Sequence, residues 1–286
     1  MADDDPSSRL DGGSDERFTI AAGRASASID ARAGGRVEQI SVGNQPLFIT
    51  PDASRAATTS WGSFPMAPWV GRIRHGRFDF DGRAHQLVRN HLDGPEGPDD
   101  QVRRHAIHGT VFARSWVVDS TTSTTIAMHC SLSADGWPFA GGVARQHIEI
   151  SERSLECGLT VETADIPFPA VIGWHPWLIA PDRLHFQPDA MYRRDRLGIP
   201  TGALGEPTAG PWDDCFIADG PVVAEYERDD APRVSIAADC DHWVIFDEHA
   251  GALCIEPQSG PPDGLNIGHE LVTSGRPLER AMRISW

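Results

Sequence analysis

Short segments of alternating apolar and polar residues recur along almost the whole chain, and this pattern limits the possible folds more than any other feature. Gly, Pro, Asn and Asp, which form turns, separate the segments. None of the segments continues into a convincing amphipathic helix. Examples are FTIAA, SASIDA, RVEQISV, GTVFARSWVV, TTIAMHCSL, RVSIAA, GALCIEP and AMRISW. Many short strands joined by turns predict an all-β fold, either an antiparallel β-sandwich or a barrel.

No shift in composition and no repeat of fixed period divides the chain. Because sandwiches and barrels reach this size as single units, we expect one domain across residues 17–286. Residues 1–16 are acidic and poor in hydrophobic residues, which predicts a disordered tail. The longest irregular stretches, residues 93–104 and 194–212, are candidates for functional loops.

Charge and composition exclude several classes of function. The formal net charge of -16 disfavours nucleic acid and anionic membranes as partners, since both need a basic surface. No apolar run approaches a membrane span of about 20 residues, and residues 1–15 lack the apolar core of a signal peptide, so we expect a cytoplasmic protein. The absence of lysine excludes a Schiff-base or P-loop lysine. The five cysteines are scattered without C-x-x-C spacing, so we expect neither disulfides nor a thiolate metal site.

Glu256 stands where a predicted strand runs into a turn. The apolar residues 252–255 precede it, and the following PQSGPPDGLN is rich in turn formers. A carboxylate there is partly desolvated by its own strand yet opens toward a loop, which raises its pKa from about 4.3 toward that of a general base. An isolated acid of this kind more often forms a structural salt bridge with an arginine. Glu256 is a candidate base because two histidine segments share its strand-to-turn character.

The two histidine segments are HAIHG, residues 105–109, and IGWHPW, residues 172–177. His105 and His108 are three apart and point to opposite faces of an extended strand, so they would not chelate one metal ion as a helical pair does. One histidine of the pair can face a cleft, while the other faces away from it. His175 lies between Trp174 and Trp177, whose flat faces suit a sugar ring. Either histidine alone could be structural, but with Glu256 they supply the groups that proton transfer requires.

A tryptophan and an arginine upstream add a possible binding surface. In FPMAPWVGRIRHGRFDF, residues 64–80, Trp69 offers a flat apolar face, Arg72 offers a planar set of donors, and prolines fix the backbone. Together they suit a polyol, although Arg72 alone could simply pair with one of the many acids.

In the order and spacing of these motifs, the chain resembles the aldose 1-epimerase (galactose mutarotase) family. The resemblance runs from AGGRVEQISVGNQPL through PWVGRIRHGRFDFDG, IHGTVFARSW, WPF, FPAVIGWHPWL and DDCF to CIEPQSGPPDGLN. It implies a large antiparallel β-sandwich of the galactose mutarotase type with an open cleft on one face. Matched motif by motif, it implies that Glu256 is the general base, His175 the general acid, His108 a substrate-polarising group, and Arg72 and Asp213 hydroxyl-binding residues. We expect Trp69 and Trp177 to contact the substrate as well.

Three positions depart from the family pattern. Gly71 stands where members often have Asn, which puts one hydrogen bond to the sugar in question. Trp177 replaces a usual tyrosine and changes the floor of the cleft. Asp213 is followed by Asp214, and only the spacing from Phe216 favours Asp213 as the binding residue.

The resemblance implies interconversion of the α and β anomers of an aldohexose such as glucose or galactose. Glu256 would take the proton of the C1 hydroxyl while protonated His175 gives one to the ring oxygen, and the roles reverse after rotation about the C1–C2 bond. This chemistry requires no metal and no cofactor. The expected partner is a small sugar, and the expected assembly is a monomer or a weak homodimer.

Three alternatives stay open. A hexose-6-phosphate 1-epimerase would use the same Glu and His but add an arginine cluster, for which Arg103 with Arg104, or Arg74 with Arg77, are candidates; the net acidity weighs against it. A non-catalytic sugar-binding protein would keep the tryptophans and lose the acid-base set. A cupin-like metal enzyme would need HxH followed by a nearby Glu, and HAIHGTVFARSW offers neither.

Overall fold

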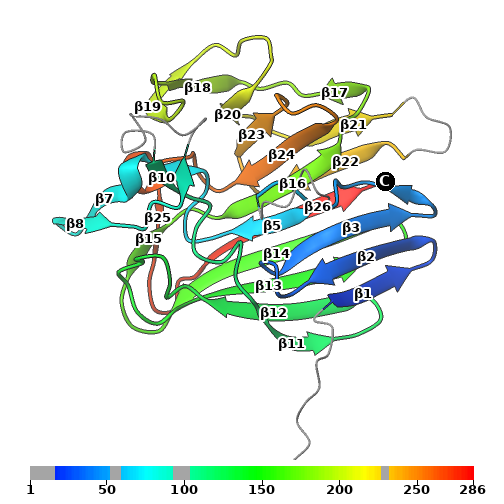
Figure 1. Cartoon of the computed structure of the whole chain (residues 1–286), viewed down its shortest axis with the longest axis horizontal. Coiled ribbons are helices and arrows are strands. Elements are labelled where there is room, and N and C mark those ends of the chain that lie inside the picture. Colours follow the sequence, from blue (N-terminus) through cyan, green and yellow to red (C-terminus); the bar gives the residue numbers. More distant parts are fainter. Residues whose placement is uncertain (1–16, 52–58, 93–103, 227–231) are drawn as a thin grey trace, which may run out of the picture.

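The computed structural model describes residues 17–51, 59–92, 104–226 and 232–286. Two large antiparallel sheets are stacked within these residues (Figure 1). The predicted all-β sandwich is therefore confirmed. The predicted tail, residues 1–16, lies outside the described residues, as does most of the predicted loop at 93–104. In the described part of the chain, no helix is long and apolar enough to cross a membrane.

The first sheet has eleven strands among the described residues. In the order of hydrogen-bonded neighbours they are β1 (Arg17–Ala22), β2 (Ala25–Asp30), β3 (Arg36–Val42), β5 (Ser63–Met66), β16 (Gly173–Ile179), β24 (Ala252–Gln258), β23 (His242–Phe246), β20 (Asp213–Ile217), β18 (Ala190–Arg194) and β19 (Pro200–Gly205), with β4 (Gln45–Pro46) beside β3. The central neighbours β5, β16 and β24 therefore come from three distant parts of the sequence (Figure 1).

The second sheet has eight strands in the same described ranges. They are, in order, β11 (Val117–Thr121), β12 (Thr125–Ser131), β13 (Gly142–Ile150), β14 (Ser154–Thr163), β26 (Leu278–Ser285), β22 (Val234–Ala238), β21 (Val222–Glu225) and β17 (Arg183–His185). The smaller elements are β6 (Arg72–Ile73), β10 (Arg104–Ile107) and β9 (His91–Leu92), the hairpin β7 (Arg77–Phe80) and β8 (Arg83–Gln86), the pair β15 (Phe168–Ala170) and β25 (Glu270–Val272), and the helical turns η1 (Arg74–Gly76) and α2 (Gly264–Ile267). In Figure 1, β7, β8, β10, β15 and β25 lie at one end of the sandwich.

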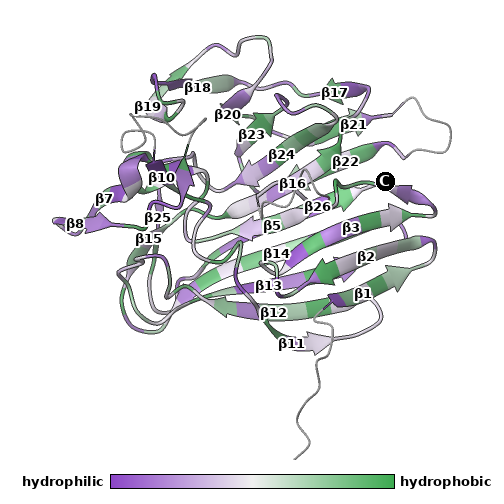
Figure 2. Ribbon diagram, viewed as in Figure 1, coloured by the Kyte–Doolittle hydropathy of each residue, from purple (hydrophilic) through white to green (hydrophobic). Residues whose placement is uncertain are grey.

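The core lies between the two sheets and follows from the alternation in the sequence. Along β2 and β13, every second residue is buried, and hydrophobic and hydrophilic residues are mixed along the strands of both sheets (Figure 2). Ile20 and Ile29 of the first sheet belong to the same buried cluster as Met128 and Ile148 of the second. Complete burial of such a side chain contributes about 1.5–3 kcal/mol, so the inward-facing positions hold the sheets together.

The central strands β16 and β24 are buried on both faces. Leu253 and Ile255 belong to the cluster between the sheets, whereas Cys254 belongs to a second cluster together with Phe64 and Trp177. Successive residues of a strand point to opposite faces, so this second cluster covers the outer face of the first sheet at its centre. Side chains on this outer face are thus held in a packed environment.

Two local expectations were wrong. The segment GTVFARSWVV becomes a strand only from Val117 onward. Gly109 has a φ of +85°, and a Cβ at this position would lie 2.0 Å from the carbonyl oxygen of Ala67, so the chain turns there. The buried guanidinium of Arg36 also binds the carbonyl oxygen of Phe112 at 3.1 Å, which removes that group from strand pairing. The second error concerns residues 194–212, which were expected to be irregular and contain β19.

Candidate active site

A cavity of about 280 Å³ lies over the outer face of the first sheet. Its walls come from β16, β20, β23 and β24, and from the segments around β6, β10 and β18. The polar and aromatic residues that line it include Arg72, His108, His175, Trp177, Arg194, Asp213, Asp214, Glu256 and Gln258. Six of the seven site residues expected from the sequence are therefore brought together, although five separate parts of the chain supply them.

The strand period explains how the key side chains come to share one face. In β24, Glu256 and Gln258 are two apart and line the cavity, while Ile255 between them packs into the core. In β16, His175 and Trp177 line the cavity and Trp174 packs into the core. Because β16 and β24 are hydrogen-bonded neighbours, these two outward rows lie side by side.

His175 and Glu256 are in direct contact. The distance from His175 Nε2 to Glu256 Oε1 is 3.2 Å, and both side chains are buried. Gln258 Nε2 donates a hydrogen bond of 3.0 Å to Glu256 Oε2 and fixes the other carboxyl oxygen. We call His175 and Glu256 the acid-base pair.

Burial determines where the acid-base pair carries its proton. It lowers the pKa of His175 to about 3. Burial, and then the nearby Asp213 carboxylate, raise the pKa of Glu256 well above its usual range, against the hydrogen bond from Gln258 and the charge of Arg72. Both shifts favour a protonated Glu256 beside a neutral His175 in the free site, the reverse of the protonation expected from the sequence. The two forms differ only by one proton moved across the 3.2 Å contact.

His108 is held beside the acid-base pair by a tight turn. It has a φ of +57°, and its N–H donates to the carbonyl oxygen of Gly71. Its ring lies edge-on to that of His175, with centroids 5.0 Å apart. Burial, and then the neighbouring His175, hold the pKa of His108 well below its usual value, so its imidazole is neutral. A neutral imidazole here can donate or accept one hydrogen bond without adding charge.

The glycine at position 71 has a structural explanation. Gly71 has a φ of +53°, and a Cβ there would lie 2.6 Å from Cβ of Pro262. Pro262 lines the cavity and occupies the space that a larger side chain would fill. The Gly71 departure from the family pattern thus accompanies a close packing of two cavity segments.

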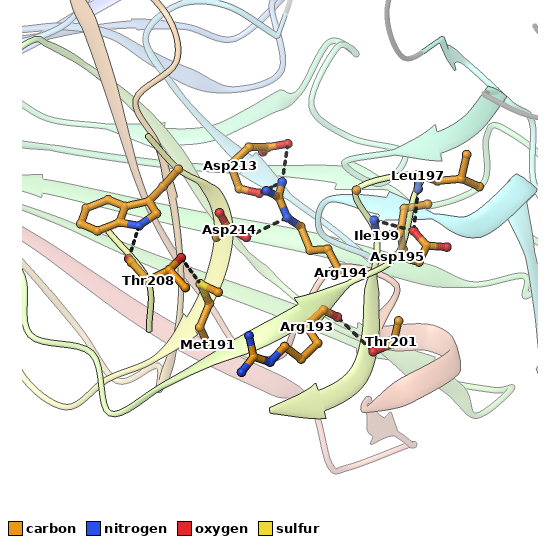
Figure 3. A network of polar contacts seen from close by, with 12 residues as sticks. Met191, Arg193, Arg194, Asp195, Leu197, Ile199, Thr201, Thr208, Asp213 and Asp214 are labelled. Atoms are coloured by element: carbon orange, nitrogen blue, oxygen red, sulfur yellow. Dashed lines mark hydrogen bonds and ion pairs between the residues drawn. The ribbon is translucent and has the colours of Figure 1, made fainter. Parts of the chain in front are cut away.

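Arginines hold both Asp213 and Asp214, and Figure 3 shows the contacts that Arg194 makes with them. Arg72 Nη2 lies 2.9 Å from Asp213 Oδ2. Arg194 Nε lies 2.7 Å from Asp214 Oδ1, and Arg194 Nη1 donates to the Asp213 carbonyl oxygen at 2.6 Å. Both aspartates line the cavity, and Asp213 is the more exposed of the two, with 30% of its side chain accessible against 7% for Asp214. Asp213 is therefore the better placed to bind a substrate hydroxyl.

The two tryptophans have different positions. Trp177 lines the cavity and stacks on His175 at an interplanar angle of 10°, which fixes the plane of the imidazole. Trp69 is only 1% exposed, belongs to the core between the sheets, and packs on Trp137. Trp69 does not line the cavity, so its expected role as a substrate contact is wrong. Its flat face is covered by other aromatic rings.

The remaining candidates lie away from the cavity. His105 is fully buried, and its Nδ1 accepts a hydrogen bond from the backbone N–H of His75. Arg74 is paired with Asp195, and Arg77 hydrogen-bonds Gln86. None of His105, Arg74, Arg77 or Arg104 lines the cavity, and Arg103 lies outside the described residues.

Gln258 and Arg194 are two of the cavity residues that the sequence did not suggest. Gln258 is two residues beyond Glu256, so the strand period already placed it on the same face. Arg194 has no comparable signal, because its role depends on β18 and β20 pairing across the sheet. One group of side chains in the described ranges could also hold a metal ion, namely His175, Cys254 and Glu256.

Comparison with known proteins identifies the family to which this β-sandwich belongs. Residues 16–260 match the family model described as aldose 1-epimerase, so the chain belongs to the aldose 1-epimerase family. It is 25% identical over 246 residues to the uncharacterized protein YihR of Escherichia coli K12, covering 74% of this chain and 75% of YihR.

Solved structures share the fold. A galactose mutarotase-like protein from Clostridium acetobutylicum superimposes with a TM-score of 0.75 at 15% identity, covering 94% of both chains. The galactose 1-epimerase of Lactobacillus acidophilus NCFM gives a TM-score of 0.72 at 14% identity, covering 94% of this chain and 93% of the other. The predicted galactose mutarotase type of sandwich is thus confirmed.

Proposed function

We propose that this protein is an aldose 1-epimerase that interconverts the α and β anomers of an unphosphorylated aldohexose. The observation that carries the proposal is the 3.2 Å contact between His175 and Glu256 on the floor of the cavity. Mutarotation requires one proton to leave the C1 hydroxyl and one to reach the ring oxygen. Two groups in contact that share one proton supply both functions.

The reaction starts from the acid-base pair in its charge-separated form. A C1 hydroxyl that donates a hydrogen bond to Glu256 stabilises the carboxylate and so favours the form with the proton on His175. Glu256 then takes the C1 proton while His175 gives its proton to the ring oxygen, and the bond between C1 and the ring oxygen breaks. Rotation about C1–C2 presents the other face of the aldehyde. The two groups then reverse their roles and close the ring.

The other cavity residues bind and polarise the sugar in this proposal. Arg72 and Asp213 hold each other at 2.9 Å and present donors and acceptors to sugar hydroxyls. His108 polarises the substrate from its position beside His175, and Trp177 stacks on His175 and can contact the sugar from the cavity wall. No step requires a metal ion or a redox cofactor.

The charges of the cavity favour a neutral sugar over a sugar phosphate. The lining contains two arginines, Arg72 and Arg194, and three acids, Asp213, Asp214 and Glu256. Both arginines are already paired with these aspartates. A phosphate would have to displace those carboxylates or lie beside them, which is unfavourable.

Polarimetry of freshly dissolved α-glucose, α-galactose and glucose 6-phosphate tests the proposal. We expect the protein to accelerate the decay of optical rotation for at least one unphosphorylated hexose after subtraction of the spontaneous rate. Acceleration of the phosphorylated sugar alone would support the hexose-6-phosphate alternative. No acceleration of any sugar, together with saturable sugar binding, would support a non-catalytic binding protein.

A further inference from the structure

Cys254 lies directly beside the acid-base pair. It is two residues before Glu256 in β24, so both side chains leave the same face of the strand, and it pairs in register with Trp177 of β16. One ligand atom from each of His175, Cys254 and Glu256 lies within 4.8 Å of the other two, and all three residues are buried. The proposed mechanism makes no use of this thiol.

The three ligand atoms suit a thiophilic divalent cation. Zinc binds thiolate sulfur at about 2.3 Å, imidazole nitrogen at about 2.0–2.1 Å and carboxylate oxygen at about 2.0–2.2 Å, so tetrahedral ligand atoms are roughly 3.5 Å apart. His175 and Glu256 already have this spacing at 3.2 Å. The sulfur of Cys254 lies within 4.8 Å of both atoms, so it has to approach them for tetrahedral coordination.

The charge of such a complex also suits a buried place. A divalent cation, one thiolate and one carboxylate sum to zero, and an imidazole that coordinates through its lone pair adds no charge. A neutral complex avoids most of the desolvation cost of a buried ion. The cavity gives an ion access to the site, because His175 and Glu256 line it.

We propose that His175, Cys254 and Glu256 form an inhibitory site for a thiophilic divalent cation such as Zn²⁺. The ion occupies the lone pairs of the acid-base pair, so it blocks proton transfer and competes with the sugar. The inhibition rests on the proposed function, whereas binding of the ion does not. Because the thiol and Glu256 must lose their protons, binding tightens as the pH rises.

Two measurements on the purified full chain test the site. Titration with CoCl₂, read by absorbance, reports a cobalt–thiolate bond directly, and ZnCl₂ is then added to displace the cobalt. We expect one ion per chain and a thiolate-to-cobalt charge-transfer band. In polarimetry, ZnCl₂ should raise the apparent KM for the sugar and leave kcat unchanged, and a chelator should restore the rate.

Cysteine variants decide between this site and other thiols. Cys254→Ala should lose the cobalt–thiolate band and weaken Zn²⁺ inhibition at least tenfold, with uninhibited kcat within about twofold of wild type. Cys215→Ala is the matched control, because Cys215 is also buried and lines the cavity but is not one of the three ligands. It should keep both the band and the inhibition. If Cys254→Ala folds poorly, Cys254→Ser preserves the size of the side chain and should give the same result.

The outcomes separate this proposal from the proposed function. A wild-type protein without a thiolate band, or a band that survives in Cys254→Ala, overturns the site. Loss of the band in Cys215→Ala overturns it as well. A band that depends on Cys254 in a protein without mutarotase activity upholds the metal site and contradicts the proposed function alone.

Discussion

Glu256→Gln is the substitution that tests the proposed chemistry most directly. Gln has nearly the size of Glu and can keep both contacts of the carboxyl group. Its side-chain oxygen can accept the hydrogen bond from Gln258, and its amide N–H can donate to Nε2 of neutral His175 on the other side. The substitution also removes a buried ionisable group whose raised pKa reflects its burial. We therefore expect the thermal midpoint to stay the same or to rise slightly.

The effect on the rate follows from the loss of the base. General acid-base catalysis contributes about 10²–10⁴-fold, which corresponds to about 3–5 kcal/mol of activation free energy at 1.36 kcal/mol per tenfold. We expect kcat to fall by this factor while KM changes by no more than about threefold, because the amide still binds a hydroxyl. A large fall in kcat with little change in KM indicates an interaction that is required in the transition state rather than for substrate binding.

The assay is polarimetry over a range of sugar concentrations at pH 7, with circular dichroism as a check on folding. Glu225→Gln is the matched control, since Glu225 lies in β21 of the second sheet and pairs with His185 away from the cavity. It should leave kcat unchanged. A folded Glu256→Gln with kcat near wild type would refute the reasoning, and Asp213 would be the next candidate for the base.

The other predictions concern pH, the histidines and packing. Burial lowers the pKa of His175 and raises that of Glu256, so the pair keeps its single proton over a wide pH range. We therefore expect kcat to persist as the pH falls through 6.5 and to decline only toward pH 3, where His175 takes up a proton. A loss of kcat centred near pH 6.5 would contradict this. His108→Asn should lower kcat at least tenfold with the fold intact, and His105→Asn should lower the thermal midpoint and spare kcat; the reverse result would exchange their roles. Gly71→Ala should lower the free energy of unfolding by about 2–4 kcal/mol, as measured with denaturant, because the backbone is left-handed there and the new Cβ would lie 2.6 Å from Cβ of Pro262. Gly82→Ala is the control: its φ is +70° but nothing lies within 4 Å, so it should cost only about 1–2 kcal/mol.

The sequence revealed those parts of the fold and site that depend on local pattern. Alternation along the segments predicted an all-β sandwich or barrel. Glu256 was marked as a candidate base at the end of a strand, but β24 continues two residues further, to Gln258. His108 lines the cavity and His105 does not, but the cause is not the strand period: β10 ends at Ile107, and His108 lies in a turn with a φ of +57°.

The sequence did not reveal the features of the site that depend on how distant strands pair and pack. The sequence around Trp69 resembles that of a binding residue, yet its side chain packs on Trp137 in the core between the sheets. Arg194 reaches Asp213 and Asp214 only because β18 and β20 are neighbours. The protonation of the acid-base pair depends on how completely the assembled sheets exclude water, which no single segment encodes.

The position of β24 has a consequence for how the protein is made. β24 is inserted between β16 and β23 in the first sheet, and β26 between β14 and β22 in the second, although both strands are close to the C-terminus. A chain emerging from the ribosome therefore holds two incomplete sheets, each with a central gap, until β24 and β26 have been made. Those gaps expose unpaired strand edges that can associate with other chains. Because Glu256 lies on the strand that closes the first gap, enzymatic activity should report only fully assembled molecules, and premature termination products should be inactive and prone to aggregate.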